Sequence, residues 1–146
     1  VNRRDFLTNS VLYAGVAAVL GGGGWYFAST VAAEAKEADL STLGNGVPAI
    51  VQIHDPNCPT CNALRREARE AACSFGENEL QFKVANLQTK EGRELAGRHG
   101  VGKITLLMFD GDGTMRLVLP GLSQAENLKP AFRRHVAKYG GKAPNS

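Results

Sequence analysis

The sequence divides into an apolar N-terminal segment and a longer region in which short apolar runs alternate with amphipathic stretches. Residues 6–33 contain no charged side chain, and a segment of this length can cross the ~30 Å hydrocarbon layer of a membrane as a helix. Beyond residue 34, charged residues occur throughout, and apolar positions follow either a strand-like or a helix-like period. The pattern predicts one folded domain preceded by an export signal or a membrane anchor.

The mixed region predicts alternating strands and helices. Runs rich in β-branched residues indicate strands, whereas apolar residues three and four apart indicate helices with one buried face. The predicted order is strand 49–54, helix 58–75, strand 80–87, helix 91–99, strands 104–109 and 115–119, and helix 125–139. The first two strands, joined by a helix, should be parallel, and the Asp-Gly repeat at 110–113 indicates a hairpin between the last two. The fold class is therefore α/β, with a mixed central sheet flanked by helices and preceded by an N-terminal hydrophobic helix.

These elements predict the domain organisation. Residues 1–33 are the export signal or membrane anchor, 34–46 a linker, 47–140 the folded domain, and 141–146 a flexible tail. The chain is long enough for one domain with a single core.

Composition narrows the range of functions. Acidic and basic residues are interspersed, the formal net charge is only +3, and no stripe of Lys or Arg is interleaved with aromatic residues. A nucleic-acid partner is therefore not expected. Three cysteines are too few for a domain held together by disulfides. No cofactor is expected.

Two of the cysteines form the C-x-x-C motif Cys58-Pro59-Thr60-Cys61, directly after the first predicted strand. Cys58 falls at the N-cap of the following helix and Pro59 at its first position, where a missing N–H has no cost. Unpaired N–H groups and the helix dipole lower the pKa of a thiol at this place, and only a thiolate attacks disulfides efficiently. Cys61 lies one turn further along, close enough to Cys58 to form a disulfide.

The third cysteine, Cys73, lies 12 residues beyond Cys61, about 18 Å along a helix and on a different side of it. It cannot reach the pair while the helix is intact. Two interpretations are open: a spare surface thiol, or a point of disulfide-linked dimerisation in an oxidising compartment.

Several strings at matching places resemble the thioredoxin family: the C-x-x-C after the first strand, residues 94–101 at a helix end, the threonine-plus-apolar strand 105–109, and residues 120–123 before the last helix. The resemblance implies a thioredoxin-like fold and a thiol-disulfide oxidoreductase that acts on protein thiols and disulfides. It also implies that Cys58 is the nucleophile and Cys61 the resolving cysteine of a redox-active Cys58–Cys61 disulfide, with Pro59 and Thr60 as part of the site.

The residues inside the motif leave the direction of exchange open. Pro59 and Thr60 are similar to the motif of glutaredoxins and disulfide-forming oxidases, whereas thioredoxins have Gly-Pro. The short domain, in contrast, favours a thioredoxin-type reductase. Asn57 stands where the family has a tryptophan.

Supporting positions also differ from the family pattern. Ile104 stands where the family has a cis proline, and a trans bond is expected because a cis bond before a non-proline residue costs about 2.5–4 kcal/mol. Gln52 and Asn86 replace a buried Asp and Lys, which predicts a contact between the two amides and the loss of the usual proton acceptor. His54 is open to two interpretations, a charge that favours the Cys58 thiolate or a solvated residue at a strand end.

The string Asn-Arg-Arg-Asp-Phe-Leu at residues 2–7 resembles a twin-arginine (Tat) export signal. Paired arginines also predict that the N-terminal end stays in the cytoplasm. The resemblance implies export by the Tat translocase to the periplasm or another extracytoplasmic compartment. Cleavage after Ala33 or Ala35 and retention as an inner-membrane anchor are both open. A reductase in that location would need a membrane redox partner.

Two alternative functions are open. Cys58 and Cys61 with His54 could hold a soft ion such as Cu(I), so copper handling is one alternative to a site without metal. A non-catalytic binding module is the other, since Ile104 and Gln52 depart from the family's site.

Overall fold

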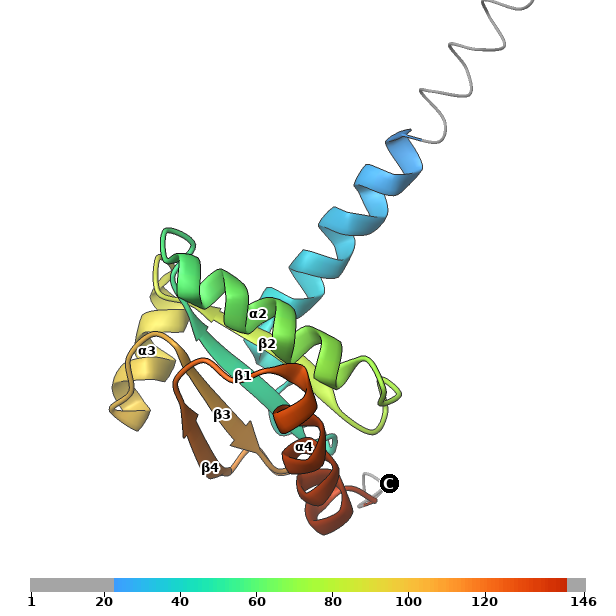
Figure 1. Cartoon of the computed structure of the whole chain (residues 1–146), viewed down its shortest axis with the longest axis vertical. Coiled ribbons are helices and arrows are strands. Elements are labelled where there is room, and N and C mark those ends of the chain that lie inside the picture. The colour runs from blue at the N-terminus through green and yellow to red at the C-terminus, as the bar shows by residue number, and fades with distance from the viewer. Residues whose placement is uncertain (1–22, 142–146) are drawn as a thin grey trace, which may run out of the picture. The chain divides into compact units, whose positions relative to one another are not determined.

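The computed structural model describes residues 23–141 of the chain (Figure 1). The chain divides into two units between Lys36 and Glu37. Residues 23–38 are helical, and between residues 23 and 141 no helix is both long and apolar enough to cross a membrane. The predicted signal motif lies outside the described residues, as does the predicted tail from residue 142 onward. Export, anchoring and the predicted domain boundaries therefore stay predictions.

The folded unit is built on one four-stranded sheet in the order β2-β1-β3-β4 (Figure 1). Strands β1 (Ala49–His54) and β2 (Gln81–Asn86) are parallel, as predicted for two strands joined by a helix. Strand β3 (Thr105–Phe109) runs antiparallel to β1 and forms the predicted hairpin with β4 (Met115–Pro120). The mixed sheet of the predicted α/β fold is confirmed.

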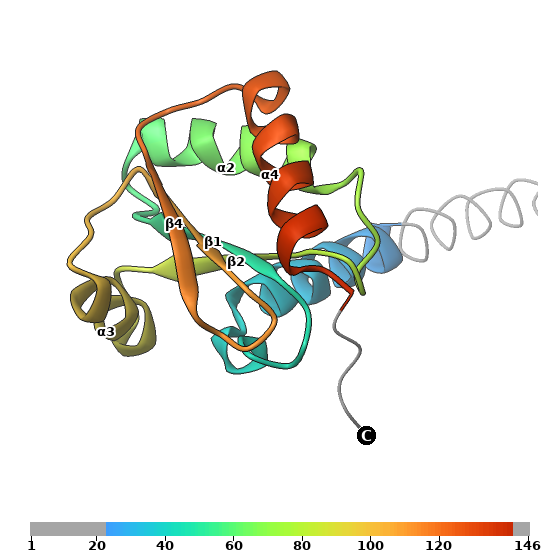
Figure 2. The ribbon, with the colours of Figure 1, turned by 90° about the horizontal axis from the view of Figure 1, so that it is seen from below.

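Helices cover both faces of this sheet (Figure 2). Helices α2 (Pro59–Ala72) and α4 (Ala125–Tyr139) pack on one face, and α3 (Lys90–His99) packs on the other. A single 3₁₀ turn, η1 (Leu40–Thr42), precedes β1. Helix α2 ends at Ala72, earlier than the predicted residue 75, because a turn in which the Phe75 amide donates to the Ala72 carbonyl follows it.

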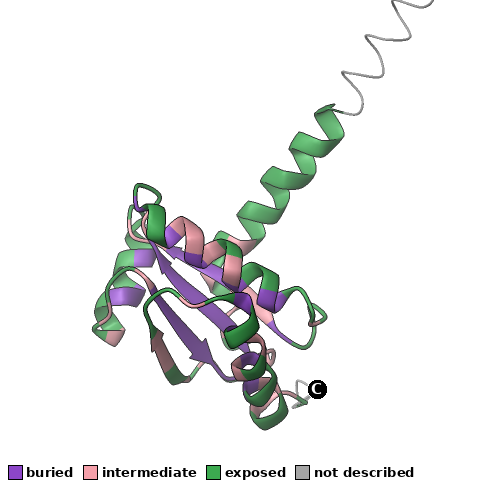
Figure 3. Cartoon of the chain, in the orientation of Figure 1, coloured by how far each residue is buried: buried purple, intermediate pink, exposed green. Residues whose placement is uncertain are grey.

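Every residue of β1 is buried, as Figure 3 shows for this central strand. Side chains alternate along it, so Ile50 contributes to the core beneath α2 and α4, and Val51 to the core beneath α3. Gln52 and His54 have the same parity as Ile50. The C-terminal half of β1 therefore places two polar side chains on the face that α2 covers.

Strand β4 forms one edge of the sheet and ends at Pro120. The next residue, Gly121, donates its amide to the carbonyl of Ile104 at 2.8 Å, so the ring nitrogen of Pro120 faces the open edge.

At the other end of the strand, Arg116 Nε binds Asp110 Oδ2 at 2.7 Å. Burial acts to raise the pKa of Asp110, but hydrogen bonds from Thr114 and Arg116 bring it below its usual value.

Helix α3 contains two glycines that provide a matched test of its packing. A methyl group on buried Gly92 would overlap the carbonyl of Asn86 at the end of β2, whereas one on Gly97 would meet open space. We expect Gly92→Ala to destabilise the domain by about 1–3 kcal/mol through overpacking. Gly97→Ala should stabilise it by about 0.5–1 kcal/mol because alanine favours the helix. Denaturant unfolding measures both, and equal effects would contradict the packing described.

Candidate redox site

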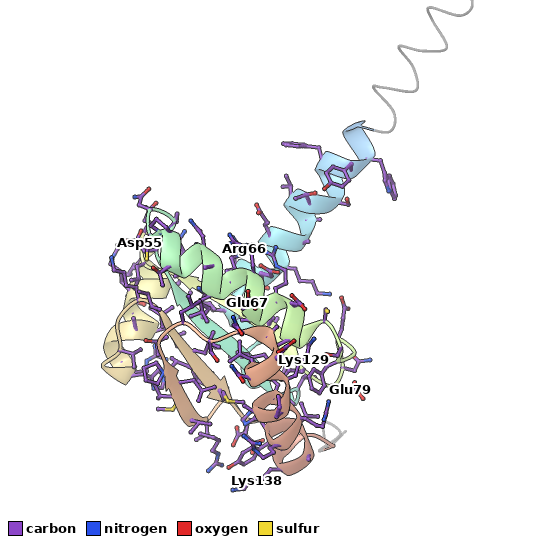
Figure 4. The ribbon with its side chains drawn as sticks, in the orientation of Figure 1. Asp55, Arg66, Glu67, Glu79, Lys129 and Lys138 are labelled. Atoms are coloured by element: carbon purple, nitrogen blue, oxygen red, sulfur yellow. The ribbon has the colours of Figure 1, made fainter. Side chains whose placement is uncertain are left out.

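The turn between β1 and α2 places Cys58 at the start of the helix. Asp55, labelled in Figure 4, accepts hydrogen bonds from the Asn57 amide on its side chain and from the Cys58 amide on its carbonyl, both at 3.0 Å. Cys58 is the N-cap residue, with an extended backbone, and Pro59 occupies the first turn. The sequence-based prediction of this helix start is confirmed.

The sulfur of Cys58 acts as the capping acceptor of α2. Cys58 Sγ accepts a hydrogen bond from the Cys61 amide at 3.3 Å. Hydrogen bonds from the Cys61 thiol and the Cys61 amide lower the pKa of Cys58, and the positive charge of Lys103 adds to this effect. The residue is 7% exposed, so only a small part of Cys58 is open to solvent.

The second sulfur of the pair is in a different environment. Cys61 is fully buried, and burial raises the pKa of its thiol. Its hydrogen bond to the Cys58 sulfur acts in the same direction. The site therefore contains one thiol that ionises readily and one that holds its proton, which are the properties required of a nucleophile and a resolving cysteine.

Lys103 is part of this site, although the sequence analysis did not select it. It lies in the loop before β3, and its Nζ is 3.9 Å from Asp55 Oδ2. Its position one residue before Ile104, in the loop that faces the motif, is the only signal that would have identified it from sequence.

Gln52 and Asn86 do not make the contact predicted for them. Gln52 Nε2 donates to the Cys61 carbonyl at 2.7 Å, while Asn86 Oδ1 accepts from the Gln88 amide at 2.8 Å. The parallel register places Gln52 opposite Val84 and Asn86 opposite His54, so the two amides are two positions apart along the sheet. The prediction of a direct amide pair is therefore wrong.

Gln52 is completely buried, and its Oε1 atom has no hydrogen-bond partner among the protein groups described. Only its donor side is used, to fix the carbonyl of Cys61. A neutral amide thus occupies the position directly behind Cys61.

His54 is 3% exposed, so the interpretation as a solvated strand-end residue is wrong. Burial, with a further contribution from the charge of Arg65, lowers the pKa of the imidazole, which is therefore neutral at neutral pH. This argues equally against the interpretation in which a charged His54 favours the Cys58 thiolate. Its Nδ1 lies 3.4 Å from Gln52 Nε2, so the ring belongs to a buried polar group behind the pair.

Ile104 has a trans peptide bond, as expected, since residues 23–141 contain no cis bond. Its φ is 60°, and in the described part of the chain it is the one non-glycine residue with a positive φ. A β-branched residue in this left-handed region is strained, and such strain occurs most often at functional sites. The Ile104 amide also favours the thiolate of Cys61, against the larger effect of burial on its pKa.

The remaining residues of the site lie at its rim. Pro59 and Thr60 are exposed beside Cys58, and the Thr60 amide makes a small contribution to lowering the pKa of Cys58. Cys73 is exposed at the C-cap of α2, where its thiol donates to the Glu70 carbonyl at 2.9 Å. Among residues 23–141, no three His, Cys, Asp or Glu side chains form a group that could hold a metal ion.

Comparison with known proteins identifies the fold. No family model and no curated protein matches the sequence. A thioredoxin-like protein from Clostridium perfringens is similar in structure, with a TM-score of 0.61 and 20% identity over 75% of this chain and 86% of that one. A thioredoxin from Malassezia sympodialis has a TM-score of 0.53 and 16% identity, covering 66% and 82%. Thioredoxin O2 from Arabidopsis thaliana has a TM-score of 0.50 and 18% identity, covering 73% and 86%.

These structural neighbours show that the chain has a thioredoxin-like fold. Within that fold, Cys58 and Cys61 form a close thiol pair at the start of α2, at the C-terminal end of the central strand β1.

The opposite pKa shifts of the two thiols can be measured in the reduced domain carrying Cys73→Ser, in which only the pair contributes. Thiolate absorbance against pH should show one cysteine ionising below the ordinary thiol pKa and one above it. Cys58→Ser should remove the lower step. Cys61→Ala should remove the upper step and move the lower one upward, because Cys58 loses the hydrogen bond from the Cys61 thiol. A lower step that survives Cys58→Ser would contradict this assignment.

Proposed function

We propose that the protein is a thiol-disulfide oxidoreductase that exchanges disulfides with protein substrates through Cys58 and Cys61. The observation that carries the proposal is the unequal pair: a thiol at the helix start with a lowered pKa, hydrogen-bonded to a buried thiol with a raised one. The thioredoxin-like fold of the structural neighbours supports it.

Reduction of a substrate would take place in two steps. The Cys58 thiolate attacks one sulfur of a substrate disulfide, forms a mixed disulfide, and releases the other substrate sulfur as a thiolate that takes up a proton. Cys61 then loses its proton and attacks Cys58 Sγ. The new Cys58–Cys61 bond replaces the mixed disulfide, and the second substrate thiol leaves with the two electrons that the pair supplied. The reverse sequence oxidises a substrate dithiol.

The surroundings of Cys58 suit an extended substrate better than a small enclosed one. Asn57, Pro59 and Thr60 are all exposed around the sulfur, and two cavities of the domain lie elsewhere, along α4 and β4. A substrate cysteine can therefore approach across the surface of the domain. This supports protein thiols and disulfides as substrates.

The direction of exchange depends on how strongly the reduced pair is stabilised. A lower pKa for Cys58 stabilises the dithiol form and makes the protein more oxidising. The reduction potential of the pair, measured against glutathione, distinguishes the two directions: a value near about −270 mV indicates a reductase and one near about −120 mV an oxidase. In the reductase case, a membrane redox partner would regenerate the dithiol.

Insulin reduction tests the proposed activity with a control that the chain itself provides. Cys58→Ser should abolish turnover, and Cys61→Ser should accumulate a mixed disulfide that mass spectrometry detects, because no second thiol can resolve it. Cys73→Ser changes the exposed cysteine outside the pair and should retain turnover. Equal rates for the parent protein and Cys58→Ser would overturn the proposal and favour a non-catalytic module.

We also propose that the domain works outside the cytoplasm after export by the Tat translocase, on the basis of the arginine pair at residues 3 and 4 and the uncharged stretch that follows. In a full-length chain, Arg3→Lys with Arg4→Lys should retain the protein in the cytoplasm, although the positive charge is unchanged. Cell fractionation measures this. Unchanged export would exclude the Tat route while leaving the redox proposal intact.

A further inference from the structure

A cavity between α4 and β4 takes no part in the exchange steps described above. Its volume is about 210 Å³, and it lies on the face of the sheet that α2 and α4 cover. Its wall includes three apolar and three cationic side chains: Met108, Leu117, Ala131, Arg116, Arg134 and Lys138. Cavities left by imperfect packing are apolar, whereas ligand sites combine apolar walls with a few polar groups. This cavity has the second composition.

The cavity exists because α4 packs chiefly against α2 and only loosely against β4 (Figure 2). Leu128 and Phe132 hold α4 in the core that it shares with α2. Towards β4 the helix presents Ala131, whose side chain is too short to fill the space between them. Protein interiors are normally packed without such gaps, so the space is a feature of this surface.

Arg116 reaches the cavity through an irregularity in β4. Met108 of β3 lies opposite Leu117 and Phe109 lies opposite Met115, which leaves Arg116 as an extra residue between the two pairs. Adjacent residues of a regular strand point to opposite faces, yet Arg116 and Leu117 line the same cavity. A β-bulge redirects a side chain in this way, and bulges are frequent beside functional sites.

The guanidinium of Arg116 lies beside the C-terminal end of α4. Its central carbon is 5.3 Å from the centre of the Tyr139 ring, and Lys138 Nζ is 5.3 Å from the same ring centre. Figure 4 labels Lys138 at this end of the helix. The ion pair with Asp110 uses Nε of Arg116, so the terminal amino groups of the guanidinium can bind a second anion.

Positive charge at the cavity exceeds the negative charge that balances it. Asp110 is paired with Arg116, and within residues 23–141 no ion pair joins Arg134 or Lys138 to a carboxylate. These two are four residues apart on α4, a spacing at which like charges destabilise a helix. The helix dipole favours Lys138 in the last turn but does not act on Arg116 in the facing strand. An anion in the cavity would relieve this repulsion.

Apolar surface continues from the cavity in one direction. A second cavity of about 280 Å³ adjoins the first, since Ala131 and Arg134 line both. Its wall includes leucines from β3, β4 and α4: Leu106, Leu119 and Leu128. Leu117, in the wall of the first cavity, is 46% exposed. Arg116 and Lys138 line the first cavity alone, so cationic groups gather at one end and apolar groups extend towards the other.

The dimensions of the site decide between possible occupants. One turn of an α-helix is about 10 Å across and about 5.4 Å long, which is more than a space of 210 Å³ holds. An added strand is discouraged because Pro120 has no N–H to offer at the edge of β4. A single hydrocarbon chain is narrow enough, and arginine binds a carboxylate through paired hydrogen bonds.

We propose that the cavity between α4 and β4 binds a small amphiphilic carboxylate, that is, a carboxylate attached to a hydrocarbon chain. The carboxylate lies among Arg116, Arg134 and Lys138. The chain runs along Leu117 and Ala131 into the second cavity. This binding does not depend on the redox function proposed above.

Decanoate, kept below the concentration at which it forms micelles, is the probe. In the isotopically labelled full chain, nuclear magnetic resonance should show saturable shifts of the amide signals of Leu117, Ala131 and Tyr139. These residue-specific signals separate the site from any binding to the apolar N-terminal segment. Arg134→Gln should weaken the affinity about tenfold or more, because hydrogen bonds to a charged group are lost. Arg133→Gln removes the same charge from the exposed neighbour outside the cavity and, as the matched control, should change the affinity less than about twofold.

The chemistry of the probe tests the two halves of the site separately. From hexanoate to decanoate, each added methylene should strengthen the binding about fourfold as it enters apolar surroundings. Decylammonium has the same chain with the opposite charge and should leave the three signals in place.

Two kinds of result would overturn the site. The first is a folded parent that shows no saturable shift with decanoate, or equal losses of affinity in Arg134→Gln and Arg133→Gln. The second is a response to a glutamate-rich peptide or to phosphatidylglycerol vesicles without any response to decanoate. That outcome would assign the surface to an acidic protein segment or to a membrane instead of a small carboxylate.

Discussion

The burial of β1 on both faces is the constraint on which the rest of the structure depends. Because the strand is covered by α2 and α4 on one side and by α3 on the other, its C-terminal end is held in place, and the turn after His54 leads directly into α2. That turn determines where Cys58 lies and which N–H groups its sulfur meets. The chemistry of the site thus begins with the packing of a strand that contains neither cysteine.

The same strand also buries two polar side chains, which has a cost in free energy. Gln52 and His54 occupy positions where Val or Ile would bury more apolar area, and Gln52 satisfies only half of its hydrogen-bonding capacity. Ile104, strained at a φ of 60°, lies near the same buried thiol. These two departures from regular packing fall at one place, next to the cysteine pair, and strained or unsatisfied groups of this kind cluster at functional sites.

The sequence predicted the features that depend on local pattern. Strand and helix order, the N-cap at Cys58 and the parallel and antiparallel pairings follow from periodicity, turn residues and connection length. Contacts across the sheet were harder to predict from the sequence. The predicted pairing of Gln52 with Asn86 was wrong because it depends on the register between β1 and β2, which no local pattern in the sequence specifies. The burial of His54 depended on α2 covering a strand end, and the left-handed Ile104 on a loop conformation that residue type alone argues against.

The edge strand β4 bears on how the domain would meet the protein substrates proposed for it. Unfolded chains offer extended segments that readily add to any open sheet, and a free edge would collect them without regard to their sulfurs. Pro120, whose nitrogen faces outward with no hydrogen to donate, interrupts that ladder. Pairing with a foreign strand is thereby discouraged along β4, one of the two edges of the sheet. Under the proposed function, a client would instead meet the exposed turn around Cys58 and be held there only while a covalent bond to its sulfur lasts.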